Sequence, residues 1–85
     1  MSLRDATYTA ASAYLSAFED QELNQLSIYQ VILEEFEKGL LEATLHRCGY
    51  NQAWTADVLG MARNTLRKKI KMLGLPQAAH ERRRK

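Results

Sequence analysis

The residues from 60 to 71, GMARNTLRKKIK, place six basic or amide side chains within one short stretch. Two apolar residues, Leu66 and Ile70, lie among them at the four-residue spacing of a helix face. Guanidinium, ammonium and amide groups bind phosphates and donate hydrogen bonds to the edges of nucleic-acid bases. The chemistry on offer is therefore recognition of a polyanion, and the alternative is an ordinary solvated helix face.

A helical projection separates the two kinds of side chain in residues 63–73. With Arg63 as the origin and about 100° per residue, Leu66, Ile70 and Leu73 fall between roughly 280° and 340°. The side chains between roughly 0° and 140° are Arg63, Asn64, Arg67, Lys68 and Lys71. A helix with one apolar side and one continuous basic side fits the major groove of DNA, which it enters with its N-terminus first.

Side-chain chemistry suggests a role for each residue of this helix. Arg63 lies near the N-terminus and is the best candidate for a bidentate contact to guanine. Asn64 suits adenine or a phosphate, and Thr65 suits a phosphate or a thymine methyl group. The remaining cations are expected to hold phosphates and to set the register on the duplex. These cations are Arg67, Lys68, Lys69 and Lys71.

Small residues and glycines indicate how this helix is held. Ala56 and Gly60 have the spacing of a helix-turn-helix, in which a small side chain lets two helices approach and glycine occupies the turn. We predict helices over residues 52–59 and 63–73, ended by Gly60 and Gly74. The residues expected to pack between the two helices are Leu59, Met61, Leu66 and Ile70.

Upstream of this unit the sequence predicts a first helix over residues 3–18. Ser2, followed three residues later by Asp5, is typical of a helix start. Residues 19–22, EDQE, interrupt the apolar pattern and are predicted to be a loop.

A second helix is expected to begin near residue 23 or near residue 28 and to end at Arg47, before a tight break over residues 48–52. Its apolar residues are Ile28, Tyr29, Val31, Ile32, Leu33, Phe36, Leu40, Leu41 and Leu45. This stripe is too wide for one covered face. We therefore expect a homodimer, and the alternative is that the C-terminal helices cover the stripe in a monomer. The expected interface residues are Tyr14, Leu15, Phe18, Ile28, Ile32 and Phe36.

Charge is divided unevenly along the chain. Residues 1–45 hold two basic and eight acidic side chains, whereas residues 46–85 hold ten basic and two acidic ones. This asymmetry favours double-stranded DNA as the partner of the C-terminal half. The acidic side chains of the second helix are most simply a solvated face, and they would also repel DNA. They are Glu34, Glu35, Glu37 and Glu42.

At 85 residues the chain is long enough for one small domain. It has no membrane helix or evident signal peptide, and its single cysteine suits a reducing compartment, so a cytoplasmic location is expected. His46 and His80 lack zinc-site spacing, and no catalytic constellation is present. Neither an enzyme, a metal, a cofactor nor a small-molecule ligand is expected. Cys48 is expected to pack, and Trp54 to lie in the core or against the dimer body.

The stretch YNQAWTADVLGMARNTLRKKIKMLGL, residues 50–75, resembles the C-terminal helix-turn-helix of the Fis family (factor for inversion stimulation). The same module is similar to the last domain of NtrC-type activators. The similarity continues upstream through LRD at 3–5 and LL at 40–41. The positions that match the shared pattern are Asn51, Gln52, Ala56, Gly60, Arg63, Thr65, Leu66, Arg67, Lys68 and Lys69.

The resemblance implies a homodimer that bends DNA between two helix-turn-helix units. It implies that Asn51 and Gln52 belong to the DNA-binding set, with Asn51 on a phosphate, Arg63 on a guanine, and Thr65 and the cations on the backbone. Ala62 and Ala53 stand where the family carries contact residues, so looser sequence preference is expected. The family's N-terminal β-hairpin arm has no counterpart here, so stimulation of recombination is not expected.

Together these patterns predict an all-α protein with four helices. Residues 1–47 would form two dimerisation helices, residues 48–75 the helix-turn-helix, and residues 76–85 a basic disordered tail. The expected function is DNA binding and bending in nucleoid organisation and transcription regulation. The alternatives are an isolated DNA-binding domain of an NtrC-type activator and a helical protein-interaction dimer that does not bind DNA.

Overall fold

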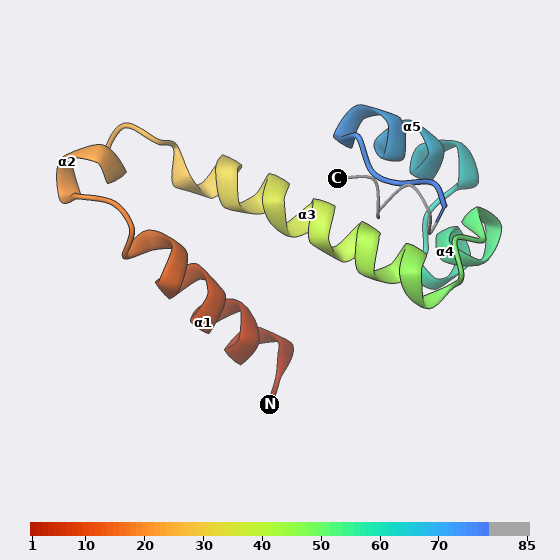
Figure 1. Cartoon of the computed structure of the whole chain (residues 1–85), viewed down its shortest axis with the longest axis horizontal. Helices are drawn as coiled ribbons and strands as arrows, with labels where there is room; N and C mark the ends of the chain where they lie inside the picture. Colours follow the sequence, from red (N-terminus) through yellow and green to blue (C-terminus); the bar gives the residue numbers. More distant parts are fainter. Residues whose placement is uncertain (79–85) are drawn as a thin grey trace. The chain divides into compact units, whose positions relative to one another are not determined.

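The computed structural model describes residues 1–78, and every regular element in this part of the chain is an α-helix (Figure 1). The helices are α1 (Leu3–Leu15), α2 (Asp20–Leu23), α3 (Ile28–Arg47), α4 (Gln52–Leu59) and α5 (Arg63–Leu73). The all-α class is confirmed, but the described residues form five helices instead of the predicted four. They fall into two compact units, and the boundary between these along the sequence lies within α3, between Glu35 and Phe36.

In the first unit, α1 begins where the sequence predicted and ends earlier. The Ser2 side chain accepts a hydrogen bond from the backbone N–H of Asp5 at 3.0 Å, which satisfies a free donor of the first turn. The helix ends at Leu15. Beyond it the bonds reach back three residues and not four, as in the bond from the N–H of Phe18 to the carbonyl of Leu15 at 3.2 Å. The prediction of helix up to residue 18 was therefore too long by one turn.

The predicted loop over residues 19–22 was wrong, since most of it is the short helix α2. The Glu22 carboxylate accepts a hydrogen bond from the backbone N–H of Glu19 at 2.9 Å. This is the reach-back contact of a capping box, and it stabilises the first turn. Of the two starts considered for the next helix, the later is confirmed, since Ser27 has φ 49° and α3 begins at Ile28.

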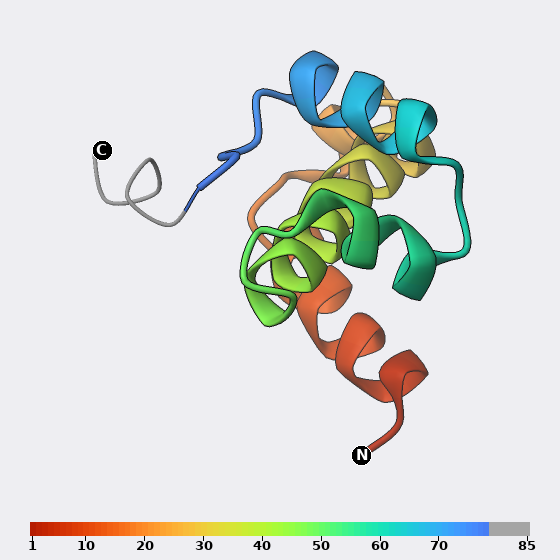
Figure 2. The ribbon, with the colours of Figure 1, turned by 90° about the vertical axis from the view of Figure 1, so that its right-hand side faces the viewer.

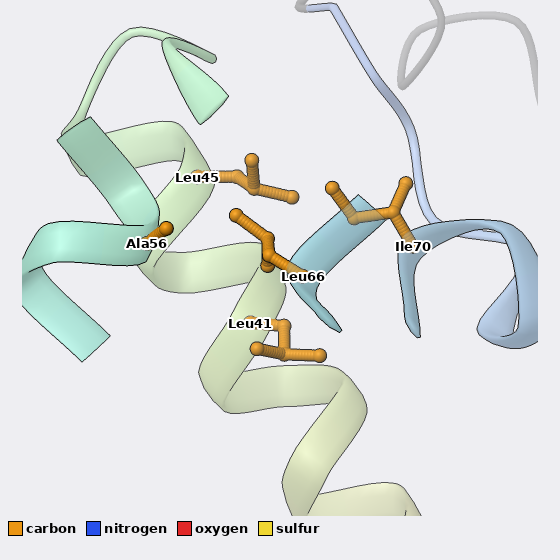
Figure 3. Packing of buried hydrophobic residues seen from close by; sticks show 5 residues of the cluster. All are labelled: Leu41, Leu45, Ala56, Leu66 and Ile70. Carbon is orange, nitrogen blue, oxygen red and sulfur yellow. The ribbon is translucent and has the colours of Figure 1, made fainter. Parts of the chain in front are cut away.

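The second unit has a core built from α3, α4 and α5. The buried apolar side chains face a common centre (Figure 3). They are Leu41 and Leu45 from α3, Ala56 from α4, and Leu66 and Ile70 from α5. Burying one Leu or Ile side chain contributes about 1.5–3 kcal/mol. Leu59 and Met61 are half-buried against this cluster, as expected for residues between the two helices.

The turn after α4 fixes how α5 leaves it. Gly60 adopts the left-handed conformation, with φ 73° and ψ 32°. The N–H of Met61 donates to the carbonyl of Ala56 at 3.0 Å, and the N–H of Gly60 donates to that of Asp57 at 3.2 Å. These two bonds define a Schellman motif, which satisfies the last carbonyls of the helix and points the next side chain back at it.

The same paired bonds end α3 and α5. The N–H of Tyr50 donates to the carbonyl of Leu45 at 2.8 Å, and the N–H of Leu75 donates to that of Ile70 at 3.0 Å. In all three motifs the residue after the glycine packs against the core; these residues are Tyr50, Met61 and Leu75. Each helix end is therefore fastened by a backbone motif and by an apolar contact. Figure 2 shows the resulting short connection between α4 and α5.

Replacing Gly60 with alanine is expected to destabilise the second unit by about 1–2 kcal/mol, the usual cost of a left-handed conformation for a residue with a Cβ. A Cβ at Gly60 would meet no atom within 4 Å, so the cost is one of backbone conformation alone. Thermal unfolding followed by circular dichroism measures it. The control is Gly39→Ala in the middle of α3, which also meets no atom and should stabilise by about 0.5–1 kcal/mol. Equal effects of the two changes would contradict this assignment.

Candidate nucleic-acid interface

The rotation of α5 about its axis is fixed by its two buried side chains. Leu66 and Ile70 are four residues apart on one face and lie in the core. Because they face inward, the opposite side of the helix faces outward. The predicted basic and amide side chains on that side are all exposed. They are Arg63, Asn64, Arg67, Lys68 and Lys71, and we name this set the basic arc.

The N-terminus of α5 lies at one end of the basic arc. The residue before the helix is Ala62, whose side chain caps no backbone group. The first N–H groups of an α-helix have no acceptor within the helix, and they favour an anion at that end. Arg63, Asn64 and Thr65 are exposed beside them. This end can therefore offer backbone and side-chain donors to the same phosphate or base edge.

Lys69 is placed differently from the other cations of α5. Its Nζ lies 2.6 Å from Oε2 of Glu37 on α3, in a hydrogen-bonded ion pair. On the projection that starts at Arg63 it falls at about 240°, beyond the basic arc and near the apolar side. The structure thus brings five of the predicted contact residues of α5 into one arc, whereas Lys69 and also Thr65, at about 200°, lie outside it.

The start of α4 carries the other two predicted contact residues, Asn51 and Gln52. Asn51 is the N-cap, and its Oδ1 accepts a hydrogen bond from the backbone N–H of Trp54 at 3.0 Å. Its side chain is exposed, and the cap uses its oxygen, so a phosphate contact would use the NH₂ group of the same amide. Gln52 follows as the half-buried first residue of the helix.

Two side chains near this cap correct or extend the sequence prediction. Trp54 was expected in the core or against the dimer body; its side chain is 49% exposed, so it is no part of the core of this chain, and contact with the dimer body stays a prediction. Thr55, which the sequence did not single out, is fully buried, and its hydroxyl donates to the carbonyl of Asn51 at 2.8 Å. That bond satisfies the buried hydroxyl and ties α4 to its own N-cap. Cys48 is buried, as expected of a packing residue.

Within residues 1–78 no group of three His, Cys, Asp or Glu side chains is placed to hold a metal ion. No helix in the same residues is both long and apolar enough to cross a membrane. His80 and most of the predicted basic tail lie in residues 79–85, outside the described part of the chain.

Comparison with known proteins assigns this arrangement to a family. Residues 32–73 match the model of the family described as "Bacterial regulatory protein, Fis family". The chain is 38% identical over 73 residues to DNA-binding protein Fis of Pasteurella multocida, which covers 86% of this chain and 72% of the relative. Identity is 37% over the same coverage to the proteins of that name from Aliivibrio fischeri and Haemophilus influenzae.

No solved structure matches the chain. The family model spans all but the first four residues of α3 and both helices of the helix-turn-helix, and the aligned relatives extend the similarity over most of the sequence. The chain is a member of the Fis family of bacterial regulatory proteins.

Proposed function

We propose that this protein is a Fis-like homodimeric regulator that binds and bends double-stranded DNA. The observation that carries the proposal is the basic arc, which is exposed along α5 opposite the two buried residues that orient the helix. An exposed cationic side on the second helix of a helix-turn-helix is the feature that enters a major groove. The relatives of this chain bear the name DNA-binding protein, which agrees with this assignment.

The proposed contacts follow the position of each side chain. Arg63 reads a guanine from the N-terminal end of α5, with Asn64 and Thr65 beside it. The backbone contacts, which give affinity without sequence preference, come from Arg67, Lys68, Lys71, Asn51 and Gln52. The mechanism is binding without chemistry, and the proposed location is the cytoplasm, at the nucleoid.

Dimerisation is supported by the exposure of the first unit. No residue from 1 to 35 is buried within the single chain. The predicted interface residues all remain partly or largely exposed within the chain. They are Tyr14, Leu15, Phe18, Ile28, Ile32 and Phe36. On α3 the exposed large residues Tyr29, Leu33, Phe36 and Leu40 also recur at alternating spacings of four and three. That spacing forms the seam along which one helix packs against another.

We therefore assign residues 1–47 to dimerisation and residues 48–75 to DNA binding. Each protomer of the dimer presents one α5 helix. The resemblance to the Fis family implies that these two helices lie closer together than one turn of straight DNA. A duplex that meets both helices must then curve.

The test is a mobility-shift assay on circularly permuted fragments that carry a site selected from a random-sequence pool. Binding with bending gives a complex whose mobility depends on the position of the site in the fragment. Affinity should fall with salt at a log–log slope of about −0.9 for each neutralised phosphate. If micromolar protein shifts no duplex at low salt, DNA binding is wrong, and a protein-interaction dimer is the better assignment.

Sedimentation tests the dimer separately. Phe36 is 39% exposed on the proposed seam, so Phe36→Asp should convert the dimer to a monomer without opening the core. Met72→Asp is the control, since Met72 is a large apolar residue that is exposed on α5, outside the proposed seam. A monomeric wild-type protein would exclude the proposed dimer.

A further inference from the structure

The ion pair between Lys69 and Glu37 separates one cation of α5 from the others. The two atoms are 2.6 Å apart, and each side chain is 36% exposed. The pair joins the recognition side of the second unit to α3, across 32 positions of sequence. A partly exposed ion pair contributes little to folding stability. The larger effect of the pair is to keep the Lys69 ammonium group beside the Glu37 carboxylate.

Lys68 and Lys69 are neighbours in sequence but lie on different sides of α5. Lys68 is exposed within the basic arc, whereas Lys69 is turned by about 100° from it, toward the apolar side. Two adjacent side chains of the same type thus sit in different electrostatic surroundings. Only Lys69 lies against a carboxylate on another helix.

An exchange of Glu37 for a phosphate would bring Lys69 no net gain in charge pairing. Lys69 would exchange one anionic partner, the carboxylate, for another, the phosphate. It would also leave the Glu37 carboxylate without its counter-ion close to a polyanion, where like charges repel. Keeping the pair avoids this repulsion and keeps α5 tied to α3.

We propose that Glu37 holds the charge of Lys69 in an ion pair within the chain, so that Lys69 does not neutralise a DNA phosphate. This inference rests on the proposed DNA binding and names which cations take part in it. Glu37 thereby limits the number of phosphates that each protomer neutralises, while the buried Leu66 and Ile70 orient the basic arc. The charge of Lys69 is balanced by the Glu37 carboxylate of the same chain.

The experiment measures the salt dependence of affinity for one duplex with four proteins. In the double variant Glu37→Gln with Lys69→Gln, the pair is removed without a change in net charge. Its slope should equal that of the wild type, and its affinity should stay within about twofold of it. Lys68→Gln should make the log–log slope less negative by about 0.9 for each protomer. For a dimer, the loss of affinity over a fourfold rise in salt should then be about twelvefold smaller than for the wild type.

Glu37→Gln alone gives a result that a purely structural pair would not give. It releases Lys69 toward the DNA, so the salt slope should steepen and affinity at low salt should rise. Because this gain passes through Lys69, it should vanish in the double variant. Thermal unfolding of each variant checks that all four proteins are folded under the conditions of binding.

The inference is overturned if the double variant loses as much slope as Lys68→Gln, because Lys69 would then neutralise a phosphate as Lys68 does. It is also overturned if Glu37→Gln leaves the slope unchanged. These outcomes differ from failure of the proposed function, in which the wild-type protein itself binds no duplex.

Discussion

Replacing Leu66 with alanine is expected to destabilise the second unit by about 2–5 kcal/mol. Leu66 is fully buried and lies between Leu41, Leu45 and Ile70 in the core (Figure 3). Its loss removes apolar contacts and leaves a cavity that its neighbours fill only in part. A core this small rarely supplies more than about 3–5 kcal/mol of stability. The variant should therefore be largely unfolded at about 37 °C, below the range of roughly 45–65 °C in which mesophile domains usually melt.

Urea unfolding followed by circular dichroism measures the effect. Met72→Ala is the matched control, since Met72 is on the same helix and 84% exposed. An exposed substitution of this kind usually changes stability by less than about 0.5 kcal/mol. Should Leu66→Ala cost no more than Met72→Ala, the buried cluster would not be what holds α5 in place.

The second large effect is expected from Arg63→Ala, which should cost about 1–3 kcal/mol of affinity at each half-site. Arg63 is exposed at the N-terminus of α5, the end that approaches the base edges in the proposed complex. Its loss should weaken the selected site more than a random duplex, because only the selected site holds the guanine it reads. Competition between these two duplexes measures the difference.

Arg67→Ala is the control for this experiment. Arg67 is an arginine of the same exposed arc, one turn further along the helix, and is assigned to a phosphate. It should weaken both duplexes alike and reduce the salt slope. If Arg63→Ala behaved in the same way, Arg63 would be a backbone contact and the base-reading residue would lie elsewhere.

Both helices of the helix-turn-helix could be predicted from the sequence to the residue, because three of their four ends carry a local sequence signal. Asn51 caps the start of α4, and Gly60 and Gly74 end the two helices in left-handed conformations. Each signal acts within four residues of the boundary that it sets. The apolar spacing of Leu66 and Ile70 then determined which side of α5 faces outward.

The errors have physical reasons of two kinds. The helix α2 was missed because Glu19 and Glu22 were taken as an interruption of the apolar pattern, although they carry a capping box. Of the two places expected for Trp54, the core of the chain was wrong, because its exposure depends on which side of α4 meets the core. The first error was avoidable from local sequence, and the second required the packing.

The pairing of Glu37 with Lys69 could not be predicted from the sequence. The two residues lie on different helices, and the contact depends on how α5 crosses α3. Glu37 was considered one of four similar acids on a solvated face, and Lys69 one of four similar cations. Only the folded unit distinguishes them.

The division of labour along α5 has a consequence for how such a protein can change. Two inward side chains anchor the helix, and its outward positions contribute almost nothing to the core. If these positions contact DNA as proposed, substitutions there can alter which DNA sequences are bound while the fold stays intact. New binding preferences could then arise, by evolution or by design, without further mutations that restore stability.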